Sequence, residues 1–335
     1  MDKPLVVVFG GSGIVGFSVA EHLCSTGQYR ARIADVREPP SLAPGMEFVR
    51  CDVRDQGAVE RALSGADVAL NMAIIQIPAI NERRRLAYEV NVLGTINICE
   101  AVAESPTVEG MIQAGSWHVF GDVGLRGTID EGFGFRPDKV EPRARLYALH
   151  KVGQEVLVRI FDEMSDKVFG VIRQGTVLGE RMPEKAAASI FIKQALSGGP
   201  ITPYKHSAYR PMLFTYMGDV CRGYEAFVEK ILNGTVRNTG SSLAKVVNIC
   251  YPEPIIVLEL AELIRDLVEE LSGGRLRPEV QVVDKGLPTL FSPEDKHMIK
   301  VDVSKAKEFL GLTELTSPEQ ALREVIGARL ASLAA

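Results

Sequence analysis

A glycine-rich turn near the start of the chain limits the fold more than any other feature of the sequence. Gly10, Gly13 and Gly16 follow an apolar run at 5–9 and precede an amphipathic run at 14–23. A strand that enters such a turn and a helix that leaves it form the first half of a βαβ unit. Glycines at this spacing let a pyrophosphate approach bare amide groups at the helix N-terminus. We therefore predict a dinucleotide site here, lined by Gly10, Gly13, Ile14, Val15 and Gly16.

An acidic residue follows the turn at the distance that this kind of site requires. Asp35 ends the apolar segment 31–34, about 20 residues beyond the glycines. A carboxylate at this place accepts hydrogen bonds from the ribose hydroxyls of NAD and repels the 2′-phosphate of NADP. The sequence therefore predicts NAD as the cofactor, although the nearby Arg37 weakens that preference.

Strand-like and helix-like segments alternate through much of the chain, which is typical of a parallel sheet covered on both faces. The expected strands are 5–9, 31–34, 47–50, 67–73, 108–114, 168–177 and 246–250. The expected helices are 14–23, 56–63, 82–104, 147–164, 256–271, 304–310 and 320–333. We predict an α/β fold, a Rossmann-type doubly wound parallel sheet with a smaller C-terminal substrate domain.

The regular alternation weakens after the segment 168–177, where proline, glycine and tyrosine become frequent. We therefore expect residues 1–174 to form the NAD-binding domain and residues 175–335 to form the substrate-binding domain. Residues near 213–230 and 246–251 are expected to return to the first domain.

Composition argues against several classes of partner. The net charge is −5, which gives no electrostatic case for nucleic acid or an anionic membrane surface. We find no apolar run of membrane-spanning length, and no signal peptide is apparent at Met1–Pro4. The five cysteines are scattered without a metal-ligand spacing, so we expect free thiols, no metal, and a cytoplasmic location.

A tyrosine and a lysine four residues apart carry the candidate chemistry. Tyr147 and Lys151 lie one turn apart on the same face of the expected helix 147–164. A phenol with a pKa of about 10 is a weak base at neutral pH. A lysine ammonium and a positive nicotinamide nearby would favour the phenolate. We predict Tyr147 as the general acid/base, Lys151 as its activator, and Ser116 as a hydrogen-bonding partner of the reacting oxygen. Tyr147 and Lys151 are also expected to contact the cofactor.

Several short motifs, in one order along nearly the whole chain, resemble those of the extended short-chain dehydrogenase/reductases. This group contains NAD-dependent sugar-nucleotide epimerases and dehydratases. The matching segments are Gly10–Gly16, Asp52–Val53, Asn71–Ala73, Asn91–Thr95, Ser116–Gly121, Tyr147–Lys151 and Phe214–Val220. The family usually has His-Leu-Ala where this chain has Asn71-Met72-Ala73.

The resemblance implies further roles. Asp52 and Val53 would contact the adenine, Met72 and Ala73 would line the cofactor site, and Asn91 would brace the helix and a water near Lys151. It also implies a homodimer, because the family pairs two long helices from each subunit. The candidates are 82–104 and 147–164, which both carry apolar residues beyond one stripe facing the sheet.

Three departures from the family pattern affect the substrate. Trp117 and His118 stand where dehydratases carry a carboxylate, which argues against dehydration. Thr176 replaces the asparagine that commonly holds the substrate diphosphate, and Arg210 is the nearest candidate for a displaced arginine. His118, Thr176 and Arg210 are therefore the candidate substrate residues. His118 is either a loop imidazole bonded to backbone or a ligand that titrates near neutral pH.

Three functions remain open at this point. The first is an NAD-dependent epimerase of a nucleotide sugar, which oxidises a sugar carbon and then reduces the ketone from the other face. The second is a net dehydrogenase or reductase of a free sugar acid or another hydroxy compound. The third, a catalytically silent NAD-binding regulator, is disfavoured because Ser116, Tyr147 and Lys151 are all present.

Overall fold

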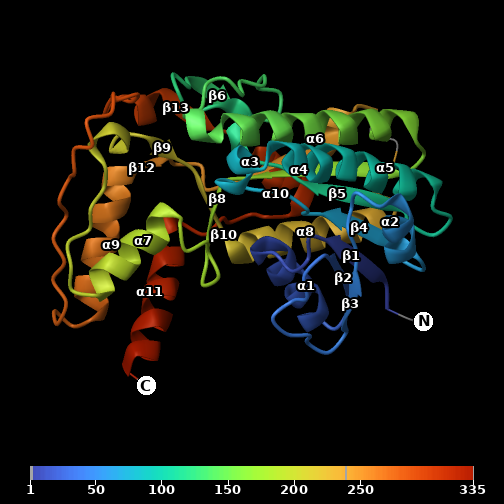
Figure 1. The fold of residues 1–335 in the computed structure, drawn as a ribbon, viewed down its shortest axis with the longest axis horizontal. Helices are drawn as coiled ribbons and strands as arrows, with labels where there is room; N and C mark the ends of the chain where they lie inside the picture. The colour runs from blue at the N-terminus through green and yellow to red at the C-terminus, as the bar shows by residue number, and fades with distance from the viewer. Residues whose placement is uncertain (1–2, 238–239, 335) are drawn as a thin grey trace.

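A parallel sheet of seven strands forms the centre of the molecule, as seen in Figure 1, a computed structural model that describes residues 3–237 and 240–334. In their order across the sheet the strands are β11 (Val246–Ile249), β7 (Val168–Gln174), β5 (Gly110–Ala114), β4 (Val68–Asn71), β1 (Leu5–Phe9), β2 (Arg30–Asp35) and β3 (Met46–Arg50). The chain reverses its direction of travel across the sheet between β3 and β4. This is the predicted Rossmann-type α/β fold, which the structure confirms.

The strand register brings several functional segments to one edge of the sheet. Phe9, the last residue of β1, pairs with Ala34 of β2 on one side and with Asn71 of β4 on the other. The carboxyl ends of these strands therefore lie together, where open α/β sheets bind their ligands. All five residues of β1 are buried, because helices cover both of its faces.

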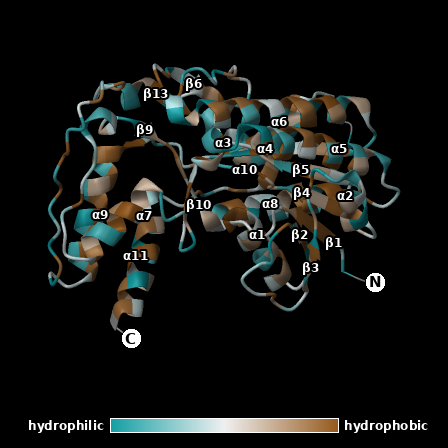
Figure 2. Ribbon diagram, viewed as in Figure 1, coloured by the Kyte–Doolittle hydropathy of each residue, from teal (hydrophilic) through white to brown (hydrophobic). Residues whose placement is uncertain are grey.

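Helices pack on both faces of the sheet (Figure 1). The helices α2 (Gln56–Leu63), α5 (Gly94–Glu104) and α6 (Arg145–Met164) contribute to one hydrophobic cluster with the sheet. The helices α1 (Ile14–Ser25), α8 (Met217–Leu232) and α10 (Ser304–Leu310) contribute to the other. Figure 2 shows the hydrophobic colouring of the strands between these layers. The apolar runs of the sequence thus form the buried strands.

A separate hydrophobic cluster lies beside this layered core. It is built by α7 (Ala187–Leu196), α9 (Val257–Leu271) and α11 (Pro318–Ala334), which Figure 1 shows grouped away from the sheet. Two short pairs of strands accompany them, β8 (Thr176–Leu178) with β10 (Phe214–Tyr216) and β9 (Pro211–Met212) with β12 (Ile255–Ile256).

Two expected elements are divided in the structure. The helix expected at 82–104 consists of α3 (Ala79–Glu82), α4 (Arg84–Tyr88), a π-helical turn at Glu89–Leu93, and α5. The strand expected at 168–177 breaks at Gly175 into β7 and β8. A Cβ atom at Gly175 would lie 2.6 Å from the carbonyl oxygen of Leu213, so this close approach requires glycine.

The long loop after β5 is held in place by a strand from near the C-terminus of the chain. Within this loop, β6 (Gly127–Ile129) pairs in parallel with β13 (Ile299–Val301).

Helices α7 and α8 form in segments where the sequence alone gave no helical pattern. In the part of the chain that the structure describes, no helix is long and apolar enough to cross a membrane. Met1 and Asp2, where no signal peptide was expected, lie outside the described residues.

Candidate active site

A cleft of about 830 Å³ runs along the carboxyl edge of the sheet. The glycine turn and the end of β2 line one part of it, and Ser116, Tyr147 and Lys151 line another. The predicted cofactor residues found in its lining are Gly10, Gly13, Ile14, Val15, Gly16, Asp35, Asp52, Val53, Met72 and Ala73. The structure thus brings residues from six parts of the sequence into one cavity.

The turn has the close backbone packing that its glycines suggested. Gly10 has a φ of +71°, and a Cβ atom there would lie 2.7 Å from the backbone of Ala73. A Cβ atom at Gly16 would lie 2.6 Å from the carbonyl oxygen of Gly10. Gly13 caps α1 without a side-chain hydrogen bond, so no side chain occupies the amide groups at the start of this helix. An anion can approach these amides directly.

Asp35 is fixed at the end of β2 by backbone donors from two loops. Its Oδ2 accepts a hydrogen bond of 3.1 Å from the amide of Ser12, and its Oδ1 accepts one of 3.0 Å from the amide of Arg37. These bonds fix the orientation of the carboxyl group, whose remaining lone pairs can accept hydrogen bonds from hydroxyl groups. Asp35 therefore lies in the cleft with a carboxyl group available to the ribose hydroxyls, which is the role predicted for it.

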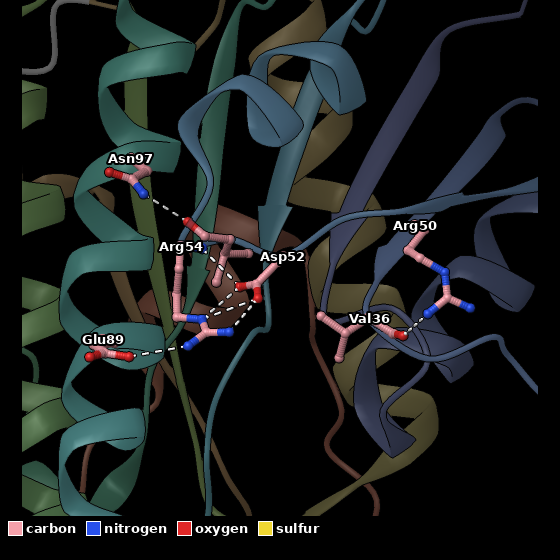
Figure 3. Close-up of polar contacts among 7 residues, drawn as sticks. Val36, Arg50, Asp52, Arg54, Glu89 and Asn97 are labelled. Carbon is pink, nitrogen blue, oxygen red and sulfur yellow. Dashed lines mark hydrogen bonds and ion pairs between the residues drawn. The ribbon is translucent and has the colours of Figure 1, made fainter.

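An ion-pair cluster surrounds Asp52 at the predicted adenine end of the cleft (Figure 3). Arg54 donates through Nη2 to Asp52 at 2.6 Å and through Nη1 to Glu89 at 3.1 Å. The hydrogen bonds from Arg54 lower the pKa of the Asp52 carboxyl, which keeps it an acceptor. Asn97 on α5 holds the same loop by donating to the carbonyl oxygen of Val53 at 2.8 Å.

The candidate catalytic residues come from a loop and a helix that pack together. Ser116 follows β5, and Tyr147 and Lys151 lie one turn apart on α6. The Nζ atom of Lys151 donates to the carbonyl oxygen of Ala114 at 2.7 Å and lies 5.9 Å from the centre of the Tyr147 ring. The spacing therefore places the ammonium next to the phenol, as the sequence predicted.

Burial disfavours the charged forms of both Tyr147 and Lys151. It raises the pKa of the Tyr147 phenol, an effect that a hydrogen bond with the Ser116 side chain partly offsets. It lowers the pKa of the Lys151 ammonium to about 7. Burial alone therefore disfavours the phenolate, so ionisation of Tyr147 depends on nearby positive charge.

His118 packs against the catalytic tyrosine as a neutral side chain. Its ring lies edge-on to Tyr147 with the two centres 5.4 Å apart, and its Nδ1 lies 3.3 Å from the Oγ of Ser116. Burial, together with the positive charges of Arg210 and Arg143, lowers the pKa of His118 to about 3. This environment does not support the reading of His118 as a group that titrates near neutral pH.

Asn91 braces a loop of the cleft from the π-helical turn. Its Oδ1 accepts from the amide of Ile75 at 2.7 Å, and its Nδ2 donates to the carbonyl oxygen of Ile75 at 3.2 Å. Its Nδ2 also lies 3.0 Å from the Nδ1 of His150. Asn91 thus holds the loop that contains Ile75 and the face of α6 next to Lys151.

The other two candidate substrate residues lie in different surroundings. Thr176 lines the cleft at the start of β8. Arg210 is mostly buried, and its Nε donates to Asp122 at 2.6 Å while its Nη1 lies 3.5 Å from Glu141. Because two carboxylates already pair with this guanidinium, its surroundings do not support the expected binding of a substrate diphosphate by Arg210.

Sequence reasoning missed two groups of residues around the site. Arg54, which orients Asp52, has only a weak signal, namely a basic residue two positions after the acidic one. The second group is a set of buried polar side chains beneath Lys151, in which Gln113 is the clearest member. A glutamine in an otherwise apolar strand was a signal that could have been followed.

The fold, the glycine turn and the serine, tyrosine and lysine of the cleft define a dinucleotide-dependent enzyme of the short-chain dehydrogenase/reductase type. The chain matches the model of the NAD dependent epimerase/dehydratase family over residues 6–249. It therefore belongs to that family, in its extended form.

Relatives with assigned names act on nucleotide sugars, according to those names. A Methanocaldococcus jannaschii protein provisionally named a UDP-glucose 4-epimerase is 27% identical over 228 residues, which are 65% of this chain and 71% of that protein. The UDP-glucuronic acid decarboxylase 1 of Danio rerio is 24% identical over 333 residues, 97% of this chain and 72% of that protein.

Solved structures share the fold along the whole chain. MoeE5 in complex with UDP-glucose and NAD superposes with a TM-score of 0.78 at 24% identity, covering 98% of this chain and 99% of the other. The UDP-glucuronic acid 4-epimerase of Bacillus cereus in complex with UDP-glucuronic acid and NAD gives a TM-score of 0.76 at 20% identity, with 98% and 99% covered.

Proposed function

We propose that this protein is an NAD-dependent epimerase of a nucleotide sugar. The observation that carries the proposal is the convergence of Ser116, Tyr147 and Lys151 in the same cleft as the glycine turn and Asp35. Family membership and the nucleotide-sugar names of the relatives support the substrate class.

NAD fits the residues that line the cleft. The open amides at Gly13–Val15 would hold the pyrophosphate, Asp35 the ribose hydroxyls, and Asp52 with Val53 the adenine. When bound, NAD supplies the acceptor of the hydride and later its donor. Placed in this way, its nicotinamide end would lie toward Ser116, Tyr147 and Lys151.

In the proposed mechanism, the protein's own residues move one proton. Tyr147, as the phenolate, takes the proton from a hydroxyl group of the sugar. At the same time the carbon that bears this hydroxyl loses a hydride. Lys151 stabilises the phenolate by its charge, and the hydroxyl of Ser116 holds the reacting oxygen by a hydrogen bond. When the ketone is reduced on its other face, Tyr147 returns the proton to the same oxygen. Thr176, at the start of β8, would contact the sugar nucleotide.

Epimerisation is favoured over dehydration by the acid–base groups near the reacting centre. Loss of water from a sugar needs a second acid or base next to the catalytic serine. Among the described residues that line the cleft, the carboxylates are Asp35 and Asp52, at its cofactor end. His118 is neutral and engaged with Ser116, and Trp117 carries no acid.

The test combines cofactor content with turnover. Purified protein should carry close to one NAD per chain and should interconvert a UDP-hexose with its 4-epimer without added cofactor. The matched control is Tyr147→Phe, which keeps the ring but lacks the transferable proton. Stabilisation only by free sugar acids, with net consumption of added NAD, would instead support the alternative, a dehydrogenase of a non-nucleotide substrate. Failure to bind NAD at all would overturn the proposal.

We further propose a homodimer formed through α6 and the segment from α4 to α5, in a cytoplasmic location. Leu149, Val156 and Ile160 form one exposed apolar stripe along α6, and Tyr88 and Leu93 are exposed on the neighbouring segment. Burying these side chains against a second copy would remove apolar surface from water. We also propose a domain division near residue 174, with 213–230 and 246–251 returning to the sheet, which the separate clusters of the sheet and of α7, α9 and α11 support. The segment 299–312 also contributes to the cluster of the sheet and is therefore added to the first domain.

A further inference from the structure

A closed circuit of hydrogen bonds lies directly beneath the catalytic lysine. It begins at Lys151 on α6, whose Nζ donates to the carbonyl oxygen of Ala114 at 2.7 Å. The Nε2 of Gln113, on the same strand, donates to that carbonyl oxygen at 3.0 Å. The ammonium and the Gln113 amide therefore share one acceptor at the last residue of β5.

The circuit continues across the sheet to a second helix. The Nδ2 of Asn71 on β4 donates to the Oε1 of Gln113 at 2.8 Å and to the Oγ1 of Thr95 on α5 at 3.1 Å. The Nε2 of Gln154 on α6 donates to the same Oγ1 at 3.1 Å, which brings the path back to the helix of Lys151. All four polar side chains are fully or almost fully buried.

Two of the three side-chain amides in the circuit, those of Asn71 and Gln113, can adopt only one orientation, whereas the Oε1 of Gln154, the third, has no partner among the described residues. Both N–H groups of Asn71 are used, and its Oδ1 accepts from the amide of Ala73 at 3.1 Å. Both N–H groups of Gln113 are also used, because its Nε2 donates to the carbonyl oxygen of Asn71 at 3.3 Å. The Thr95 hydroxyl accepts twice and donates to the carbonyl oxygen of Asn91 at 2.8 Å. Reversing either amide would place like groups together.

We infer that Gln113 and Asn71 are positioning residues, which fix the Ala114 carbonyl and thereby hold the Lys151 ammonium next to Tyr147. This inference rests on the proposed function, because it concerns the same reacting centre. Ala114 is the point at which β5 ends, two residues before Ser116, and the Gly115 amide of the same peptide donates to the carbonyl oxygen of Ile172 on β7 at 2.7 Å. The sheet thus holds the N–H side of this peptide, and Gln113 holds its carbonyl side. Asn71 stands where the family usually has histidine, and here its amide supplies the link to Gln113.

Other titratable groups around Lys151 contribute little charge of their own. His118, which packs on Tyr147, is neutral because its pKa lies at about 3. Burial also lowers the pKa of His150, whose Nδ1 faces the Asn91 amide. Glu155, further along α6, is paired with Arg173. Arg210 and Arg143, whose charges reach His118, are paired with Asp122 and Glu141. The Lys151 ammonium is therefore the positive charge next to the phenol that no carboxylate pairs with among the described residues.

The test is a substitution that removes the amide but keeps its length, Gln113→Met. Without its second donor, the Ala114 carbonyl is held only through the Gly115 amide of the same peptide, so the position of the carbonyl, and of the Lys151 ammonium that binds it, becomes less well defined. We expect kcat at pH 7 to fall about tenfold, with KM little changed. Because less positive charge reaches Tyr147, the acidic limb of the pH profile should move upward by roughly half a pH unit or more.

A second variant and a matched control keep the test decisive. Thr95→Val breaks the circuit at another point with almost no change in shape and should shift the limb in the same direction. Asn248→Leu removes a buried amide on β11 whose side chain has no hydrogen-bond partner within residues 3–237 and 240–334, and should leave the profile unchanged. If both circuit variants fold and have the wild-type pH profile, the inference is wrong.

A spectroscopic readout separates this inference from the proposed function. Tyrosinate absorbance can be titrated in the NAD-bound protein, with the Tyr147→Phe variant subtracted, and needs no turnover. A higher pKa of Tyr147 in Gln113→Met supports the positioning role whatever the substrate is. An unchanged pKa overturns that role even if epimerisation is observed.

Discussion

At the scale of single residues, the site is a set of groups whose charge depends on burial. Tyr147 should be indispensable because it carries the transferable proton. Tyr147→Phe is expected to lower kcat by about 10³-fold or more, the range typical of a lost general acid–base group. NAD affinity, measured by calorimetry, should stay within about threefold, since the phenol contributes little to cofactor binding. Substantial turnover by the variant at neutral pH would show that another group is the base.

Lys151 should make the stability of the protein depend on pH. Burial lowers its pKa from 10.5 to about 7, so between these values the unfolded chain binds a proton that the folded chain does not. Stability should therefore rise with pH across this window, and the penalty is complete below pH 7. Lys151→Met should raise Tm of the cofactor-free protein at pH 6.5 by about 2 °C or more. The difference from wild type should vanish as the pH approaches 10.5.

His118 should not determine the pH profile of the enzyme. Its pKa of about 3 leaves the imidazole neutral throughout the range in which the enzyme can be assayed. His118→Gln keeps a polar side chain and should change kcat without moving either limb of the profile. A limb near pH 6.5 that disappears in this variant would contradict the prediction.

At the scale of elements, the π-helical turn at Glu89–Leu93 supports the cleft through one side chain. Asn91 satisfies both backbone groups of Ile75, which lies in the cleft lining. Asn91→Leu would leave these groups without partners, at a cost of about 1–3 kcal/mol. We expect weaker NAD binding and a lower Tm, measured by calorimetry and thermal unfolding. Asn97→Leu, which removes a bond to the neighbouring loop, is a useful comparison.

Some helices and strands could be predicted from the sequence, whereas the breaks within them could not. The runs at 5–9 and 56–63 are the strand β1 and the helix α2, because local pattern and tertiary packing agree there. The division of the expected helix 82–104 was not foreseeable, since the π-helical turn forms where Asn91 reaches across to Ile75. The glycine turn and Asp35 were found because each needs a particular residue type. Arg210 was misread because its partners, Asp122 and Glu141, are close only in the folded chain.

At the scale of the whole molecule, the exposed stripe on α6 predicts how two copies associate. Leu149, Val156 and Ile160 recur at helical spacing on the face that the sheet does not cover. A charge at the centre of this stripe, Val156→Asp, should convert a dimer to monomers because an unpaired carboxylate would be buried. Light scattering at micromolar concentration measures the mass directly. A wild-type monomer would overturn the dimer, and Gln281→Asp, at an exposed site away from α6, controls for the added charge.

The wide sequence separation within the main core has a consequence for how the protein is made. The cluster that contains Val6 and Val8 also contains Val247, Ala306 and Leu310. The strands that pair with β1 are synthesised by residue 71, but most of the chain must be synthesised before this cluster is complete. Until β11 emerges, β7 remains an open, apolar edge of the nascent sheet. Completion of this core is thus a late event in biosynthesis, and until then the open edge of β7 can pair with a strand of another chain.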